Sequence, residues 1–365
     1  MKTIYFTVNN DLNYDQRMIR ICSSLAGQGY IICLIGKRSK NSTALLPRPY
    51  QQIRIRCRFK KGKFSYLEYH YRLLYFLLFI KADCFCAIDL DTILPVWIAS
   101  KIKRIPRVYD AHELFTEMKE VITRPAIRKI WTMLEQLTLP HFKNGYTVSD
   151  SIAGFYQKKY QVEYSTIRNI PVKTVEPPLL HKDKYILYQG AVNEGRGLEY
   201  LIPAMQYVNC PLIICGDGNF MNQSLKLVSH YQLQDKVLFK GMLLPEALKN
   251  ITLSSYIGVN LVEPAGLNQL YSLANKFFDY IHAAVPQLTM DFPEYSKING
   301  KYKVALLTHT LEPRHLAGLL NILLENTVLY DELQQNCLSA REEYNWQTEE
   351  KTLIEFYYQI FSKIG

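Results

Sequence analysis

The sequence predicts an α/β protein with two doubly wound parallel sheets. Short apolar runs alternate with segments of helical periodicity, and this alternation starts afresh after residue 184. The chain of 365 residues is also too long for one ordinary hydrophobic core. We therefore expect an N-terminal domain at 1–170, a linker rich in proline and charge at 171–184, a C-terminal domain at 185–345 and a last helix at 346–365.

The first half begins with a buried strand and an amphipathic helix. Met18, Ile21, Cys22 and Leu25 recur at i, i+3, i+4 and i+7, which is helical spacing, and Gly29 is well placed to end that helix. The strands expected in this half are 3–8, 30–35, 84–88, 107–109 and 145–148, and the later helices are 94–102 and 125–139.

The second half repeats the pattern. Its expected strands are 185–189, 212–215, 237–239, 256–262 and 287–290, and the tail at 348–362 has the periodicity of one amphipathic helix. Because ligands of such sheets bind at the carboxyl ends of the strands, we expect a ligand cleft where the two sheets face one another.

The composition indicates a globular protein whose charge is uneven. Residues 1–180 hold 28 Lys and Arg against 14 Asp and Glu, whereas residues 181–365 hold 15 against 19, so that +14 and −4 make the net charge of +10. The basic half is expected to face something anionic. The eight cysteines form no CxxC pair and predict reduced, buried thiols in a cytosolic protein. The longest apolar candidate, 73–80, is too short to span a membrane and predicts a buried helix or strand.

One stretch of the second half, 258–286, has the residues of an anion site. A strand ends near Glu263, a loop follows, and a helix starts close to Asn275 and Lys276, with Asp279 one turn further on. The start of a helix offers free N–H groups and a positive dipole end, so a lysine there can bind phosphate. Asp279 can reach a ribose hydroxyl from the same face. The alternative is that Lys276 and Asp279 form a solvated ion pair and that Glu263 is only a loop carboxylate.

A second piece follows the first strand of this half. The loop QGAVNEGRG carries Gly190, Gly195, Arg196 and Gly197, which would let backbone approach a diphosphate while Arg196 supplies charge. Gly216 begins GDG after the next strand, which is weak evidence alone, since such a turn is often only structural. It does not complete the dinucleotide fingerprint GxGxxG, because residue 221 is Met.

These segments, in this order, resemble glycosyltransferase family 4. The resemblance is carried by YQGAVNEGRGLEYLI, LIICGDGN, VLFKGMLLPEAL and ANKFFDYIHAAVP in the second half and by NNDLNYDQRMIRICSSLAGQGY, VYDAHELFTE and YTVSDSIAGFY in the first, so that it covers nearly the whole chain. It implies the GT-B fold, with a C-terminal helix that returns to the N-terminal domain. It also implies a retaining transferase that uses a nucleotide-diphosphate sugar and needs no cofactor and no obligatory metal.

The resemblance also implies roles for single residues. Arg196 and Lys276 match the pair of cations on the donor diphosphate, Glu263 matches the first carboxylate of the Glu-x7-Glu motif near the sugar, and Asp279 stands where the second carboxylate holds the ribose. Gly190, Gly216, Gly241 and Asn275 complete the expected donor site, with the base against the loop 240–243. Two departures matter: fifteen residues separate Glu263 from Asp279 instead of seven, and asparagines and aspartates replace the usual glycine pair after the first strand.

Acceptor binding is expected in the first half. His112 closes a strand and matches a histidine near the transferred sugar, where it can hydrogen-bond a hydroxyl or move a proton; a histidine that only caps a helix is the alternative. The cationic run Arg54, Arg56, Arg58, Lys60, Lys61 and Lys63 is followed by the aromatic residues Phe64, Tyr66, Tyr69 and Tyr71, which suits an anionic membrane surface, or else forms the solvent face of a strand.

The sequence thus predicts a hexosyltransferase-type enzyme in the cytoplasm or at the inner face of the cell membrane. Its partners would be a nucleotide-sugar donor and a glycan or lipid-linked acceptor, not nucleic acid. His112, Glu263, Arg196 and Lys276 are the expected catalytic residues, and the leaving diphosphate itself would accept the acceptor's proton. A sugar-nucleotide epimerase or hydrolase on the same fold, or a non-catalytic partner, remain the alternatives.

Overall fold

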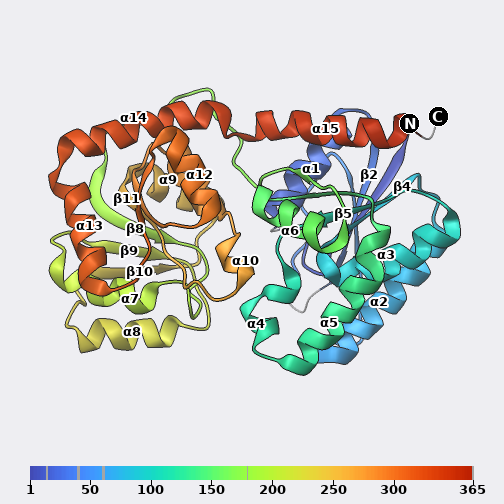
Figure 1. Ribbon diagram of the computed structural model, residues 1–365, viewed down its shortest axis with the longest axis horizontal. Coiled ribbons are helices and arrows are strands. Elements are labelled where there is room, and N and C mark those ends of the chain that lie inside the picture. The colour runs from blue at the N-terminus through green and yellow to red at the C-terminus, as the bar shows by residue number, and fades with distance from the viewer. Residues whose placement is uncertain (14, 39–41, 60–61, 179, 364–365) are drawn as a thin grey trace. The chain divides into compact units, whose positions relative to one another are not determined.

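The computed structural model describes residues 1–13, 15–38, 42–59, 62–178 and 180–363, and the chain divides into two compact units (Figure 1). The first unit comprises Met1–Asn169 and Glu349–Gly365, and the second comprises Ile170–Thr348. Each unit has its own parallel sheet, with helices on both faces.

The first unit is built on a seven-stranded sheet in the order β3-β2-β1-β4-β5-β6-β7. The strands are β1 (Thr3–Thr7), β2 (Ile31–Lys37), β3 (Gln51–Ile55), β4 (Cys84–Ile88), β5 (Arg107–Ala111), β6 (Asn144–Thr147) and β7 (Ser165–Thr166), and all neighbours pair in parallel. Every residue of β4, the central CFCAI strand, is buried, as expected of a parallel strand covered on both sides.

The helices of this unit are α1 (Gln16–Gly27), α2 (Gly62–Phe79), α3 (Asp89–Lys103), α4 (Lys119–Ile122), α5 (Pro125–Thr138), α6 (Asp150–Tyr160) and the last helix, α15 (Trp346–Ser362). Helices α2 and α5 both pack on α3. The end of α15 packs against β1 of the same sheet, because Tyr357 is fully buried with the centre of its ring 6.0 Å from that of Phe6. The prediction that the last helix returns to the N-terminal domain is therefore confirmed.

The second unit has a six-stranded parallel sheet in the order β10-β9-β8-β11-β12-β13. Its strands are β8 (Asp183–Gln189), β9 (Leu212–Cys215), β10 (Val237–Gly241), β11 (Ser255–Asn260), β12 (Gln287–Met290) and β13 (Ala305–Thr308). Its helices are α7 (Leu198–Ala204), α8 (Met221–His230), α9 (Pro245–Ser254), α10 (Leu267–Leu270), α11 (Asn275–His282), α12 (Pro293–Tyr302), α13 (Pro313–Glu325) and α14 (Thr327–Glu343). Strand order reverses between β8 and β11, which makes their carboxyl ends the place where such a sheet binds ligands.

The two doubly wound sheets predicted from the alternation of strands and helices are confirmed. Strands β4, β9 and β12 have the predicted limits, and the apolar run 73–80 lies almost entirely in α2. Strands β3, β7 and β13 were not among the predicted strands; β7 has two residues and β13 only four, so neither gives a clear periodic pattern. All eight cysteines are free thiols, and Cys57 is the one that is not buried. Within the described residues, no helix is long and apolar enough to cross a membrane.

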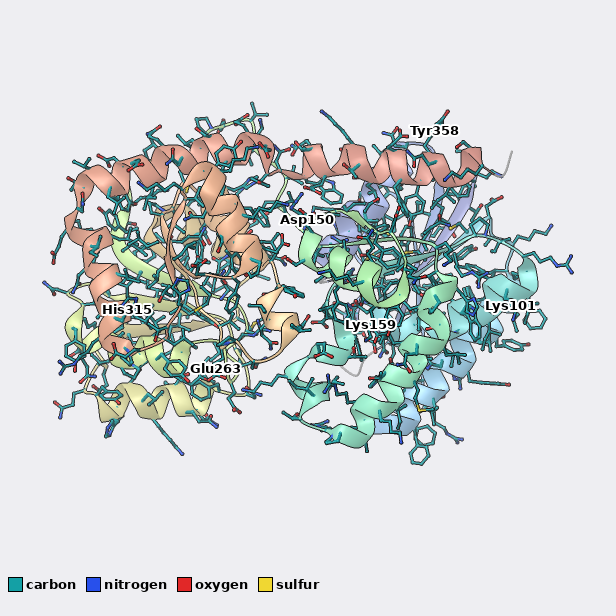
Figure 2. All side chains as sticks on the ribbon, in the orientation of Figure 1. Lys101, Asp150, Lys159, Glu263, His315 and Tyr358 are labelled. Atoms are coloured by element: carbon teal, nitrogen blue, oxygen red, sulfur yellow. The ribbon has the colours of Figure 1, made fainter. Side chains whose placement is uncertain are left out.

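The buried aromatic contact of α15 gives a test of the fold. Replacing Tyr357 by Ala should lower the free energy of unfolding by about 3 kcal/mol, because it leaves a cavity under Phe6 and removes the partner of the Tyr146 hydroxyl, 3.4 Å away. Tyr358, 62% exposed and directed away from the sheet in Figure 2, is the matched control, and its change to Ala should cost less than about 0.5 kcal/mol. Urea unfolding measures both, and equal losses would contradict this account of how α15 is held.

Candidate functional site

The carboxyl ends of β8, β9 and β10 are joined by backbone contacts through three glycines. Gly190 N–H donates to the Cys215 carbonyl at 2.9 Å, and Gly216 N–H donates to the Gly241 carbonyl at 2.8 Å. Gly216 has φ of +146°, and a Cβ there would lie 1.8 Å from the Gly190 carbonyl oxygen. The sequence predicted these glycines as part of a donor site, and the structure brings all three to one edge of the sheet.

The loop after β8 leads into α7 and carries Arg196. Gly197 is the N-cap of α7 with φ of +83°, and a Cβ on it would come within 2.6 Å of Leu261 Cβ, so a side chain cannot be accommodated. The loop is held across the switch point, because Glu263 N–H donates to the Gly195 carbonyl at 2.9 Å. Arg196 itself is exposed at this edge.

Lys276 lies in the first turn of α11, next to Asn275, as the sequence predicts. The helix begins after Ala274 without a side-chain cap and without an acidic residue in its first turn, so its first N–H groups and positive dipole end are not neutralised by a cap. The Lys276 ammonium lies 4.0 Å from the centre of the Tyr188 ring, and its Cε lies 3.6 Å from where a Cβ on Gly190 would be. A cation held over an aromatic face is stabilised in its charged form.

Two effects oppose that charge. Burial and then the nearby Arg196 lower the pKa of Lys276, which Asp279 raises in part, and together they bring it to about 7. Within the described residues, neither Lys276 nor Arg196 has a carboxylate within ion-pair distance, whereas several other lysines and arginines of the chain do. The two cations that the sequence placed on a diphosphate are thus brought together at one site.

Asp279 lies one turn beyond Lys276 and faces β8. Its carboxylate accepts a 2.9 Å hydrogen bond from Gln189 Nε2, and Gln189 Oε1 accepts one of 2.6 Å from the Thr252 hydroxyl. Among the described side chains, Lys276 and Asp279 do not come within ion-pair distance, although Asp279 raises the pKa of Lys276. The structure therefore does not contain the solvated ion pair that was the alternative.

Glu263 lies on the loop after β11, labelled in Figure 2, and the Tyr200 hydroxyl donates to its Oε1 at 3.0 Å. It lines an open pocket of about 430 Å³ together with Tyr200, Met290, His309 and Glu312. The long insertion that separates it from Asp279 contains the short helix α10, Leu267–Leu270. Glu263 therefore belongs to the same strand-end region as Arg196, joined to it through the Gly195 contact.

His112 belongs to the first unit and lies just after β5. Its Nε2 is 3.2 Å from Asp110 Oδ2, its Nδ1 is 3.7 Å from Asp89 Oδ2, and its backbone N–H donates to Asp89 Oδ1. Asp110 is fully buried and also binds the Arg17 guanidinium at 2.9 Å, while Arg17 donates to the Ile167 carbonyl.

This cluster keeps His112 charged. Burial by itself would lower the pKa of His112, but the Asp110 and Asp89 carboxylates outweigh it and raise the pKa to about 9. Burial raises the pKa of Asp89, and Arg17 and His112 hold the pKa of Asp110 below its ordinary value against the effect of its burial. Both ring nitrogens face a carboxylate, which favours the protonated ring, and the role of His112 near the transferred sugar stays a prediction.

Several residues of these sites were not found in the sequence. Tyr188 and Gln189 are the last residues of an apolar strand, and only the three-dimensional placement of α11 reveals that they contact Lys276 and Asp279. Arg17 and Asp89 are separated from His112 by tens of residues, and no local pattern joins them. The only sequence pattern that could have indicated Tyr188 is its place at the end of the strand that precedes the glycine loop.

Comparisons with known proteins agree with this geometry. Residues 172–340 match the family model described as glycosyl transferases group 1. Sucrose-phosphate synthase from Thermosynechococcus elongatus superposes with a TM-score of 0.81 at 15% identity over 100% of both chains. Anabaena HepE in complex with UDP-glucose gives a TM-score of 0.74 at 14% identity over 98% of this chain and 100% of the other. WaaG, a glycosyltransferase involved in lipopolysaccharide biosynthesis, gives 0.72 at 15% identity over 96% and 98%. No curated protein sequence matches the chain.

The chain has the GT-B fold. At these identities the solved structures establish that fold over the whole chain, and the family model adds a sequence match that covers both Arg196 and Lys276. Together they support a glycosyltransferase.

The proximity of the two cations predicts how they influence each other. Changing Arg196 to Ala should raise the pKa of Lys276 above about 7, because a neighbouring positive charge is removed while burial is unchanged. The pKa can be followed by NMR of ¹³C-methylated lysine, with Arg314→Ala in the same unit as the control. An unchanged Lys276 pKa in the Arg196 variant would mean that the two cations do not share one site.

Proposed function

We propose that the protein transfers a sugar from a nucleotide-diphosphate donor to a glycan or lipid-linked acceptor, with retention of the anomeric configuration. The observation that carries the proposal is the pair Arg196 and Lys276. Among the described residues these two cations have no carboxylate in ion-pair contact, and their place at the start of α11 and at the switch point of a doubly wound sheet suits a doubly charged anion.

The proposed reaction uses these cations on the leaving group. As the bond between the sugar and the diphosphate breaks, negative charge builds up on the diphosphate, and Lys276, Arg196 and the first N–H groups of α11 stabilise it. Lys276 enters the reaction charged, because the donor's own negative charge raises its pKa on binding. The leaving diphosphate then accepts the proton of the acceptor hydroxyl while the new bond forms on the same face of the sugar. No cofactor and no metal ion are invoked, since the cations supply the positive charge.

Other residues have binding roles in this proposal. Asp279, positioned by Gln189, binds the ribose hydroxyls, and Glu263, positioned by Tyr200, contacts the transferred sugar from the pocket that it lines. His112 contributes a fixed positive charge in place of a base, through the ion cluster with Asp110 and Asp89. If a covalent intermediate occurs, Glu263 is the nucleophile we would test.

The acceptor is assigned to the basic first half of the chain. Its charge of +14 over residues 1–180 suits an anionic glycan or a lipid-linked sugar at the cytoplasmic face of the membrane. An epimerase or hydrolase on the same fold would consume the donor without an acceptor, and a non-catalytic partner would turn over nothing. The two alternatives are therefore separated by one assay with and without acceptor.

The donor site can be tested with one matched pair of variants. Lys276→Met should weaken binding of a nucleoside diphosphate roughly tenfold to a hundredfold, because the binding free energy of one hydrogen bond between charged groups is lost. Lys226→Met, an exposed lysine on α8 of the same unit, should leave it unchanged. Titration calorimetry with UDP, GDP and ADP measures the affinities, and NMR of the product formed from the best donor reports its anomeric configuration.

Equal affinity in Lys276→Met and the parent protein would reject the donor site. Product formation with inverted configuration would reject retention but keep the site, and donor consumption without any acceptor would favour the hydrolase or epimerase.

A further inference from the structure

The outer face of α2 carries a stripe of exposed apolar side chains. Phe64, Leu67, Tyr71, Tyr75 and Phe79 are 58%, 62%, 71%, 60% and 74% exposed. Their spacing of three or four residues places all of them on one side of the helix. The opposite side is in the core, where Tyr69, Leu73 and Leu77 are fully buried. The exposed stripe is thus as regular as the buried one.

Helix α5 repeats this arrangement beside α2. Ile130, Met133 and Leu137 are 66%, 59% and 54% exposed. The two helices meet through the rings of Tyr66 on α2 and Trp131 on α5, whose centres are 5.4 Å apart, and Figure 1 shows α2 and α5 next to each other. Both helices also pack on α3.

The charged groups on this surface are cationic. Arg72 on α2 and Arg128 and Lys129 on α5 are exposed. Arg72 and Arg128 also bind the less exposed carboxylates Glu68 and Glu117 at 2.8 and 2.7 Å, and Glu135 is buried against Lys159. Among the residues of α2 and α5 whose side chains the structure describes, none of the exposed ones is a carboxylate. A large apolar stripe edged by cations and free of exposed acids is typical of a helix that lies in the headgroup region of a bilayer.

The cationic run that the sequence assigned to the membrane does not have this form. Arg54 is only 9% exposed and binds Asp11 at 2.6 Å, while Tyr66 and Tyr69 face the core. Lys60 and Lys61 lie outside the described residues, and the Lys63 side chain is not described either. Arg56 and Arg58 are exposed, so the membrane contact of the run 54–63 stays a prediction.

We propose that the α2–α5 face, defined by the eight apolar residues above, binds the surface of an anionic lipid bilayer. The apolar side chains enter the boundary between headgroups and acyl chains, and Arg72, Arg128 and Lys129 reach the phosphates with their long stems. A second copy of the chain is the poorer occupant, because a symmetric pairing of this face would bring its own cations against each other. The inference deepens the proposed function, since a lipid-linked acceptor is presented at such a surface.

Vesicle binding tests the face without any transfer reaction. The full chain is mixed with vesicles of phosphatidylcholine alone or with about a third phosphatidylglycerol, and the bound fraction is measured by flotation. We expect binding to the anionic vesicles, and we expect Tyr75→Glu with Met133→Glu to weaken it roughly tenfold, since two charges would have to enter the apolar boundary. The matched control is Leu244→Glu with Val328→Glu, 78% and 79% exposed in the second unit, which should bind like the parent protein.

Three outcomes overturn the proposal: no binding to anionic vesicles, equal loss in the control pair, or a dimer in sedimentation that the α2–α5 variants dissociate. Circular dichroism and UDP affinity of each variant separate this result from a failed donor site. α2–α5 variants that lose vesicle binding but keep UDP affinity support the face. The Lys276→Met variant should do the reverse, with weaker UDP binding and unchanged vesicle binding.

Discussion

Two positive charges, held together with no carboxylate in ion-pair contact among the residues that the structure describes, are the feature on which the account of this protein depends. Bringing the Lys276 ammonium close to Arg196 in a partly buried place is unfavourable, and the lowered pKa of Lys276 is the measure of that cost. The Tyr188 ring offsets part of it by presenting an aromatic face at 4.0 Å. The remaining cost is relieved by an anion, which is why the site should bind a diphosphate strongly and hold it more strongly still as its charge grows.

The fold brings these charges together through backbone contacts at the carboxyl ends of neighbouring strands. Arg196 comes from the loop after β8, and Lys276 comes from the helix after β11, the two strands between which the strand order reverses. The close approach of Gly216 to Gly190 keeps this edge free of side chains. The hydrogen bond from Glu263 N–H to the Gly195 carbonyl ties the two loops to one another, so that Glu263 and Arg196 are held in one frame.

The first unit uses charge in the opposite way. His112, Asp110, Asp89 and Arg17 form a closed cluster in which every charge has a partner. The cluster joins α1 to the end of β5, and its carboxylates raise the pKa of the imidazole. The exposed cations Arg72, Arg128 and Lys129 lie instead on α2 and α5, where Arg72 and Arg128 keep ion pairs with Glu68 and Glu117.

Much of this arrangement could be predicted from the sequence, and the remainder depends on contacts between distant segments. The strands, the glycine loop and the helix with Lys276 follow from local periodicity and from the chemistry of Gly, Arg and Lys. The pairing of both His112 nitrogens could not be predicted, because Asp89 and Arg17 come from other elements. The basic run was assigned to a membrane on its charges and on the aromatic residues that follow it, whereas the burial of Arg54 against Asp11 is a tertiary effect that such a pattern does not contain. The run 73–80 was predicted to be buried, yet Tyr75 and Phe79 are exposed, because periodicity does not say which of two apolar sides is covered.

Proton uptake on nucleotide binding tests the central claim most directly. At pH 8 a lysine with a pKa of about 7 is mostly neutral, and a bound diphosphate should restore its charge, so that UDP binding takes up close to one proton. Calorimetry in two buffers of different ionisation enthalpy measures this number. Uptake close to one in the parent protein and close to zero in Lys276→Met is the predicted result. Tight UDP binding without proton uptake would contradict it, because the diphosphate would then be held by groups other than Lys276.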